Sequence, residues 1–177
     1  MATHGSLLDR FDHAEYRLCR RLNRGVELAW VRVLFKTASR LGDGVIWYAV
    51  MLALPFLYGD QGLRVGLIML ATSAANLATY KFLKRTFVRE RPFIRHAGIS
   101  LAQAPLDRYS FPSGHTLHAV AFTWQACAAF PELSFVLVPL ALAIAASRVV
   151  LGLHYPTDVL VGALLGVISG SIGATFA

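Results

Sequence analysis

Residues 147–158 read Ser-Arg-Val-Val-Leu-Gly-Leu-His-Tyr-Pro-Thr-Asp and lie between two apolar runs. An arginine beside an apolar run is energetically costly unless an anion pairs with it, so Arg148 is a candidate residue for binding an anion. The Pro-Thr pair predicts a loop that turns into a helix near Asp158. Asp158 lies four residues after His154, so its carboxylate can hold one imidazole nitrogen and leave the other free to attack a substrate. In the structural alternative, Asp158 only caps the helix, His154 is a hydrogen-bonded histidine without a chemical role, and Arg148 extends its charged end to the membrane surface.

The composition points to a membrane protein. Of the 177 residues, 56% are hydrophobic and 15% are charged, whereas soluble domains typically have roughly 45–50% and about 25%. The formal net charge of +7 suits an anionic partner such as a lipid headgroup or a phosphate substrate. No basic helix or aromatic-basic strand pattern indicates that nucleic acid is the partner. The two cysteines indicate neither a disulfide framework nor a zinc site.

The apolar runs predict an all-α fold, a polytopic membrane bundle of about five transmembrane helices. The expected spans are residues 45–58, 63–82, 116–130, 133–150 and 159–176. The first and third are short against the roughly 20 residues that a spanning helix needs, whereas the last is rich in glycine and alanine, as tightly packed membrane helices are. Residues 59–62 are expected to form a turn, and residues 84–111 the only long loop.

Residues 1–42 precede the spans and predict amphipathic helices, over residues 6–24 and 27–41, that lie in the membrane interface. The second of these carries a basic stripe at four-residue spacing opposite an apolar face. An ordinary surface helix packed on its own domain is the alternative. We expect residues 1–177 to form a single domain, in which residues 43–177 are the transmembrane bundle that carries the site.

The alternation of spans and loops brings four helix ends to one side of the membrane. The second span ends at the long loop and the third begins from it, while the fourth ends at residues 152–157 and the fifth begins there. Polar side chains that suit an anion lie at these ends, namely Lys84, Arg91, His115, Arg148, His154 and Asp158. The hydropathy pattern therefore predicts one site built from residues far apart in the chain.

The segment from Lys84 to Arg91 supplies two cations to this site. The two residues are seven apart, or two helical turns, which predicts that both side chains face the same way. They suit a dianionic phosphate, to which arginine can donate two parallel hydrogen bonds. A positive flank that anchors a span in lipid headgroups is the alternative.

Residues 112–115, Pro-Ser-Gly-His, have the pattern of a helix start. A helix N-terminus offers free backbone amides and a positive dipole end to an anion. Gly114 lets the backbone approach a ligand, Ser113 adds a hydroxyl donor, and His115 is placed to pass a proton to a leaving group. The alternative is a capped helix with an exposed histidine.

Together the three stretches resemble the signature of the type 2 phosphatidic acid phosphatase superfamily of lipid phosphate phosphatases. That signature is a lysine, six residues and Arg-Pro; then Pro-Ser-Gly-His; then Ser-Arg, five residues, a histidine, three residues and an aspartate. All eleven fixed positions match in order, at Lys84, Arg91, Pro92, Pro112, Ser113, Gly114, His115, Ser147, Arg148, His154 and Asp158. The match covers residues 84–158, and residues 1–60 carry no motif.

The resemblance implies a role for each site residue. His154 would attack phosphorus and form a phosphohistidine, Asp158 would orient it, and His115 would protonate the leaving oxygen and then activate water. The phosphate oxygens would be held by Lys84, Arg91, Ser113, the Gly114 amide and Arg148. Phosphoryl transfer needs mainly positioning and charge stabilisation, so we expect no metal and no other cofactor.

The implied reaction is hydrolysis of a phosphomonoester or diphosphate on a lipid. A polyprenyl diphosphate such as undecaprenyl diphosphate is the expected substrate, with phosphatidic acid or phosphatidylglycerol phosphate as the alternative. A vanadate-dependent haloperoxidase shares the phosphate pocket, but those enzymes are soluble. A non-catalytic lipid-binding protein would be expected to have an incomplete signature.

The resemblance to small bacterial members implies a multi-pass protein of the bacterial inner membrane. The eight Lys and Arg residues within residues 1–40 favour a cytoplasmic site by the positive-inside rule. The family more often faces its site outward, so the sequence leaves the side open.

Overall fold

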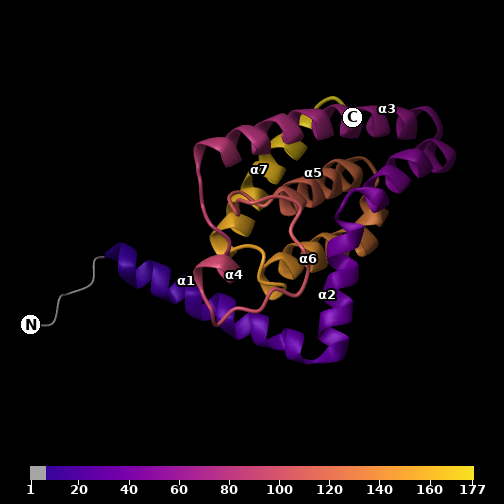
Figure 1. Ribbon diagram of the computed structural model, residues 1–177. Coiled ribbons are helices and arrows are strands. Elements are labelled where there is room, and N and C mark those ends of the chain that lie inside the picture. Colours follow the sequence, from indigo (N-terminus) through magenta and orange to yellow (C-terminus); the bar gives the residue numbers. More distant parts are fainter. Residues whose placement is uncertain (1–6) are drawn as a thin grey trace, which may run out of the picture.

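The computed structural model describes residues 7–177, which form helices and connecting segments without a strand (Figure 1). The all-α fold predicted from the sequence is therefore confirmed. The elements are α1 (Leu7–Asn23), η1 (Arg24–Glu27), α2 (Ala29–Leu41), α3 (Val45–Thr86), α4 (Pro92–Arg95), α5 (Gly114–Ala129), η2 (Pro131–Leu133), α6 (Ser134–Val150) and α7 (Pro156–Ala174).

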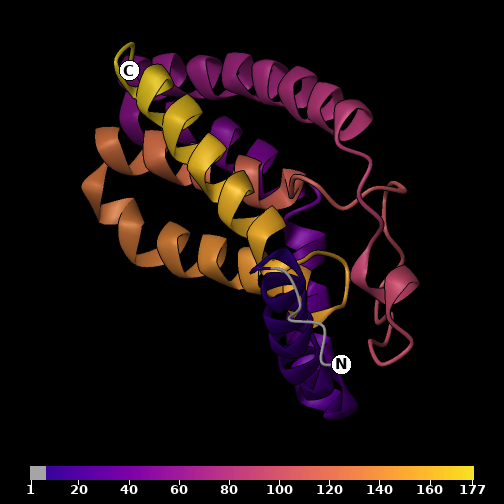
Figure 2. The same cartoon turned by 90° about the vertical axis from the view of Figure 1, so that its left-hand side faces the viewer.

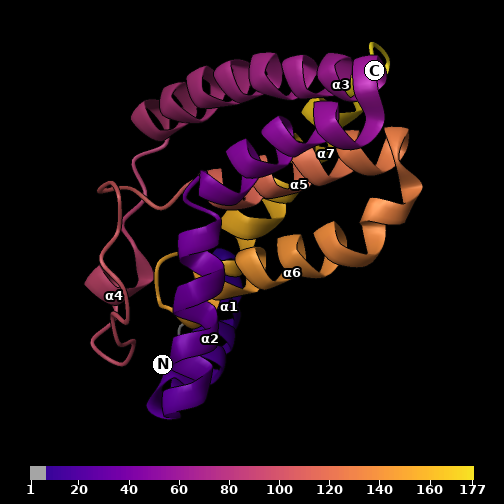
Figure 3. The same cartoon turned by 90° about the vertical axis from the view of Figure 1, so that its right-hand side faces the viewer.

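Helix α3 is a hairpin of two helical arms broken at Gly59. Gly59 has φ 59° and ψ −137°, a conformation that a residue with a side chain rarely adopts. The arms fold back on one another (Figure 3), and a Cβ atom on Gly62 would lie 2.0 Å from the backbone oxygen of Leu54. The expected spans 45–58 and 63–82 are these arms. The expected four-residue turn between them is wrong, because glycine reverses the chain at one residue.

Helix α5 occupies the centre of the bundle, where it packs against α3, α6 and α7. The main core cluster joins Trp47 and Met69 from the two arms of α3, Phe122 from α5 and Ile144 from α6, all at most 2% exposed. Because lipid tails are as apolar as these side chains, close van der Waals packing, and not removal from water, stabilises the arrangement in a membrane. This cluster fixes where α5 begins relative to the ends of α3 and α6.

The contact between α5 and α7 is made by backbone rather than by large side chains. Gly162, Gly166 and Gly170 follow one another at four-residue spacing on α7, and a Cβ atom on each would lie 2.6–3.0 Å from a carbonyl oxygen of α5 or of the residue that caps it. Only glycine allows so close an approach. The close packing expected from the glycine-rich run 159–176 is thus present.

Large apolar side chains on the outside of the bundle match a membrane environment. Phe56 of α3, Phe135 of α6 and Leu160 of α7 are 89%, 84% and 67% exposed, which is unusual in a water-soluble domain when many such residues lie together. By length and composition, three helices could cross a membrane: α3, residues 131–150 and α7. Because α5 has only 16 residues, the count of five spans stays a prediction.

The predicted convergence of helix ends is present. The end of α3, the start of α5, the end of α6 and the start of α7 gather near residues 87–113, while the Gly59 break and the α5–α6 turn lie at the opposite end (Figure 3). Helices α1 and α2 pack at the same end as the converging helices, against α6 and α7 (Figure 2). These are the two expected N-terminal helices; their location in a membrane interface stays a prediction.

Candidate active site

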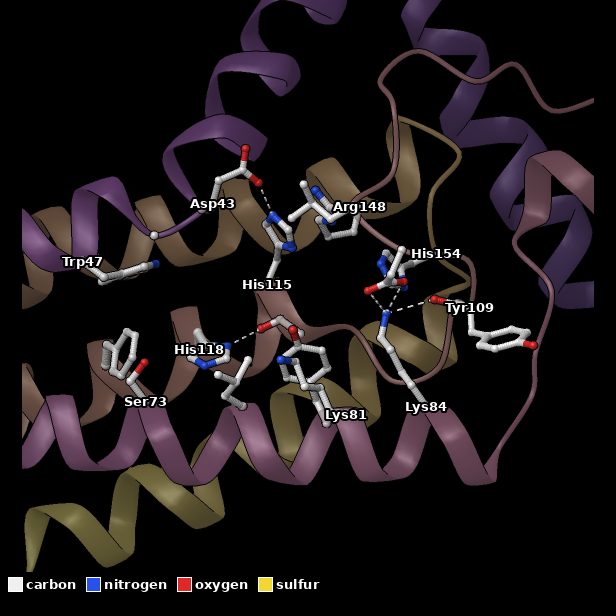
Figure 4. A pocket seen from close by; sticks show the side chains of 18 of the residues that line it. Asp43, Trp47, Ser73, Lys81, Lys84, Tyr109, His115, His118, Arg148 and His154 are labelled. Carbon is white, nitrogen blue, oxygen red and sulfur yellow. Dashed lines mark hydrogen bonds and ion pairs between the residues drawn. The ribbon is translucent and has the colours of Figure 1, made fainter.

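A pocket of about 540 Å³ opens where the helix ends converge (Figure 4). Six of the residues singled out from the sequence line this pocket, namely Lys84, Arg91, Gly114, His115, Arg148 and His154. The other two, Ser113 and Asp158, are fully buried. Folding therefore brings the three sequence stretches to one place.

His154 lies between Asp158 and Arg91 in the loop that precedes α7. Its Nδ1 is 3.6 Å from Asp158 Oδ2, and its Nε2 is 3.3 Å from Nη1 of Arg91. Because a guanidinium can only donate, Nε2 accepts and the ring proton belongs on Nδ1, toward the carboxylate. This tautomer leaves the lone pair of Nε2 on the side of the cations.

The electrostatic surroundings keep His154 neutral. The ring is 2% exposed, and burial lowers its pKa well below the ordinary value of 6.5, with Arg148, Arg91 and Lys84 lowering it further. Burial penalises the charged imidazolium, and nearby cations repel it. A neutral imidazole near pH 7 is the form that can act as a nucleophile.

Asp158 combines the structural and the functional interpretations of its motif. As the third residue of α7, it accepts a hydrogen bond from the backbone N–H of Tyr155 through Oδ2 at 2.8 Å, within a capping box. Its other oxygen, Oδ1, accepts one from Arg89 at 2.7 Å. The cap therefore holds the carboxylate where it meets His154.

Arg89 was not among the residues predicted for the site. It donates to Asp158, to Thr157 Oγ1 at 2.8 Å and to Glu15 Oε2 at 2.5 Å, and its guanidinium lies 3.9 Å from the ring centroid of Tyr155. Glu15 belongs to α1, is 6% exposed and also accepts from the backbone N–H of Thr157 at 3.0 Å. An N-terminal helix is thus connected to the His154–Asp158 pair.

Lys84 and Arg91 do not share a helical face, contrary to the sequence prediction. Helix α3 ends at Thr86, and Arg91 is extended, with φ −75° and ψ 152°, because the residue before a proline avoids the helical region. The two cations instead meet at Asp107. Its carboxylate lies 2.7 and 2.8 Å from Lys84 Nζ and 2.7 Å from Arg91 Nη2.

Arg148 reaches the pocket from the last turn of α6 and is 2% exposed. Its Nη1 donates to Ser39 Oγ of α2 at 2.5 Å, and its backbone oxygen accepts from Leu153 and His154 at 3.1 and 2.9 Å. Among residues 7–177, its buried Nε has no hydrogen-bond partner. A buried donor without a partner is costly, which makes this nitrogen a candidate contact for an anion.

The start of α5 has the expected helix cap. Ser113 is the N-cap residue, and its side-chain oxygen lies 2.9 Å from Thr116 Oγ1. Its backbone N–H donates to the backbone oxygen of Asp158 at 3.0 Å. The hydroxyl is engaged inside the cap, so a direct contact between Ser113 and a phosphate stays a prediction. Gly114 lines the pocket and faces the ring of Tyr80, whose nearest atoms would lie 3.6 Å from an added Cβ.

His115 meets a carboxylate that the sequence interpretation missed. Its Nε2 lies 2.6 Å from Oδ1 of Asp43, in the corner between α2 and α3. The sequence Gly-Asp-Gly at residues 42–44 was interpreted only as a break between helices. The available signal was an acidic residue at a helix end on the side where the other ends converge.

Metal ligands do not gather in the part of the chain that the structure describes. There, no group of three or more His, Cys, Asp or Glu side chains lies close enough to hold a metal ion. The charges that line the pocket are side-chain cations and the carboxylates of Asp43 and Asp107.

Comparison with known proteins places this geometry in a family. The PAP2 superfamily matches residues 63–176. Decaprenylphosphoryl-5-phosphoribose phosphatase of Mycobacterium tuberculosis is 32% identical over 136 residues, 76% of this chain and 73% of that protein. Undecaprenyl-diphosphatase BcrC of Bacillus subtilis is 29% identical over 127 residues, 71% of this chain and 65% of that protein.

Solved structures share the fold. Aquifex aeolicus LpxE superposes with a TM-score of 0.74 at 25% identity, over 90% of this chain and 94% of that one. A PAP2-type phosphatidylglycerolphosphate phosphatase from Bacillus subtilis superposes with a TM-score of 0.69 at 24% identity, over 98% and 87% of the two chains. The chain therefore belongs to the PAP2 superfamily, as its signature indicated, and is a phosphoric ester hydrolase.

Proposed function

We propose that the protein is a lipid phosphate phosphatase in which His154 attacks phosphorus and becomes a phosphohistidine. The observation that carries this proposal is the state of His154: it is buried, its pKa is lowered well below 6.5, and its Nε2 accepts from Arg91. The substrate phosphate would take the place of the Asp107 carboxylate between Lys84 and Arg91 and would also meet the Nε of Arg148. Fixed cations of this kind stabilise the charge that develops during phosphoryl transfer.

In the first half-reaction, Nε2 of His154 forms a bond to phosphorus as the bond to the lipid oxygen breaks. The leaving oxygen takes a proton from His115, so the lipid departs as an alcohol or, from a diphosphate, as a monophosphate. The imidazole of His154 becomes positively charged, and the carboxylate of Asp158, 3.6 Å from Nδ1, offsets that charge.

In the second half-reaction, the now neutral His115 removes a proton from water, and the resulting hydroxide attacks the phosphohistidine. Inorganic phosphate leaves, and both histidines return to their starting states. His115 thus serves as acid and then as base, the usual consequence of reversing the roles across a covalent intermediate. No step requires a metal ion or another cofactor.

A polyprenyl diphosphate such as undecaprenyl diphosphate is the substrate that we propose. In support, one relative is named for decaprenylphosphoryl-5-phosphoribose and another for undecaprenyl diphosphate. Besides the cations, apolar side chains line the pocket, among them Met51, Leu77 and Phe122, which suits the first units of a lipid chain. Phosphatidic acid and phosphatidylglycerol phosphate have the same general chemistry and are the alternatives. The proposed location is the bacterial inner membrane.

Phosphate release by the purified protein from a panel of lipids tests both levels of the proposal. The panel holds undecaprenyl diphosphate, undecaprenyl phosphate, phosphatidic acid and phosphatidylglycerol phosphate, each in matched detergent micelles. The highest kcat/KM is expected for undecaprenyl diphosphate; a higher value for a glycerolipid would reject the substrate but keep the enzyme class.

The covalent step is tested separately, by quenching the enzyme during turnover of a labelled lipid phosphate. Acid-labile, base-stable label on the wild-type protein, and none on His154→Ala, is the expected result. His154→Ala should lose roughly 10⁴–10⁶ in turnover, as nucleophile deletions do. Retention of more than a tenth of the activity in this variant would reject His154 as the nucleophile.

A further inference from the structure

The corner between α2 and α3 carries a carboxylate directly against the proposed general acid. Asp43 Oδ1 lies 2.6 Å from Nε2 of His115, and Figure 4 shows the two side chains pointing toward one another with Arg148 beside them. The two residues are 72 positions apart, and Asp43 lies outside residues 63–176, which match the family. The contact therefore adds a group that the family signature does not contain.

The sequence around Asp43 allows this close approach. A Cβ atom on Gly42 would lie 2.8 Å from Ile144 Cγ2 and 3.1 Å from His115 Cδ2, so a larger residue would push the corner away from α5. Gly44 has φ +121°, a conformation that favours glycine, and it turns the chain into α3. The two glycines on either side place the aspartate over the start of α5.

We propose that Asp43 is a positioning residue for His115, holding the imidazole in one tautomer and stabilising its protonated form. This inference rests on the proposed function, because it gives His115 the role of acid and base. An imidazole held at Nε2 by a carboxylate keeps its proton there and exchanges protons with substrate and water through Nδ1 alone.

In this arrangement, Nδ1 of His115 carries out both proton transfers of the reaction. In the first half-reaction, Nδ1–H of the imidazolium passes its proton to the leaving oxygen, and the neutral ring keeps Nε2–H bonded to Asp43. In the second half-reaction, Nδ1 takes a proton from water and the imidazolium forms again. Asp43 stays ionised throughout, so no proton crosses the ring and no other acid is needed.

The carboxylate of Asp43 opposes the other influences on the charge of His115. Burial lowers the pKa of His115 below its ordinary value, Arg148 from α6 and His118 from the next turn of α5 lower it further, and the hydrogen bond with Asp43 opposes them. His154 also faces His115 across the pocket. The same hydrogen bond lowers the pKa of Asp43, so the aspartate is ionised near neutral pH. Removal of this carboxylate should therefore reduce the protonated fraction of His115 further.

The test compares two leaving groups through kcat/KM, which reports the steps up to cleavage of the first bond. A lipid monophosphate releases an alkoxide that needs a proton, whereas p-nitrophenyl phosphate releases a stable anion that does not. Asp43→Asn should lower kcat/KM about 10²-fold on the lipid, within the range for general acid catalysis, and less than about 3-fold on the aryl phosphate. Its high-pH limb on the lipid should move to lower pH, and Asp43→Glu should restore part of the activity.

A double-mutant cycle separates positioning from a purely structural role. In a His115→Ala background, Asp43→Asn should cost nothing further, because the residue acts through His115. Asp60→Asn, directly after the Gly59 break at the opposite end of the bundle, is the matched control and should leave kcat/KM on both substrates unchanged. Equal losses on the two substrates, or full additivity with His115→Ala, would overturn the inference. Wild-type protein without phosphatase activity, or an active His154→Ala, would instead overturn the proposed function.

Discussion

Replacement of Gly162 by alanine should damage the site through the backbone. Gly162 faces the start of α5, and an added Cβ would lie 2.6 Å from the backbone oxygen of Ser113. The backbone N–H of Ser113 in turn donates to the backbone oxygen of Asp158 at 3.0 Å. The methyl group therefore enters the place where the starts of α5 and α7 hold His115 and Asp158 in register.

The geometry sets the size of the effect. A Cβ makes ordinary contact from 3.4 Å, so the new contact at 2.6 Å is short by 3.4 − 2.6 = 0.8 Å. The obstacle is a backbone oxygen, so the helices must separate by about that amount. Overpacking of this kind costs roughly 1–3 kcal/mol, and a displacement of about 1 Å between reacting groups costs on the order of 10²-fold in rate.

Gly166→Ala is the matched control for this prediction. Its Cβ would lie 2.7 Å from the backbone oxygen of Leu117 and 2.8 Å from the Cβ of Val120, a conflict at least as severe, but one turn farther from the site. Gly166→Ala should lower the midpoint of thermal unfolding in detergent at least as much as Gly162→Ala, whereas kcat/KM should fall about 10- to 100-fold in Gly162→Ala and several-fold less in Gly166→Ala. If the two variants lost activity equally, or if neither was destabilised, the argument from close backbone packing would be refuted.

Four further outcomes are expected. Arg89→Ala should lower stability by about 3–5 kcal/mol, because it strands buried carboxylates, and Arg89→Lys should recover part of it, as measured by chemical unfolding. Asp107→Asn should tighten inhibition by phosphate, since no carboxylate then competes for Lys84 and Arg91; weaker inhibition would contradict this. Because the pKa of His154 is lowered, its neutral form persists below pH 6.5, so its contribution to the acid limb of kcat/KM should lie below pH 6.5. Vanadate should inhibit as a mimic of five-coordinate phosphorus, while excess EDTA should leave activity unchanged; strict dependence on magnesium would contradict the mechanism.

The arrangement of the helices could be predicted because it follows from hydropathy and from loop order. Apolar runs locate the spans, and alternation of their direction places Lys84 and His115 at the same end of the bundle. The predictions that were wrong concern the local backbone conformation. A single glycine, Gly59, reverses the chain without a loop, and the proline after Arg91 prevents the helix that would have aligned Arg91 with Lys84.

The convergence of the signature residues on one pocket could be predicted, but the partners of these residues could not. Asp43 meets His115 across 72 positions, Glu15 meets Arg89 across 74, and Ser39 meets Arg148 across 109. Contacts at such separations depend on how α1 and α2 pack against α6 and α7, which no local pattern encodes. The first members of these pairs are also ordinary as sequence features: an aspartate between glycines, a glutamate in an amphipathic helix, a serine in another.

The charges around the pocket indicate how a phosphate could enter without leaving a buried cation unpaired. Arg89 is satisfied by the buried carboxylates of Glu15 and Asp158, which have no route out of the packed helices. Lys84 and Arg91 are satisfied by Asp107, whose side chain is 39% exposed and belongs to a loop. Asp107 is therefore the carboxylate that can withdraw into water, so an entering phosphate would exchange one anion for another at these cations. The hydration that Asp107 regains would offset part of the cost of desolvating the phosphate, and the departure of Asp107 would then be part of substrate binding.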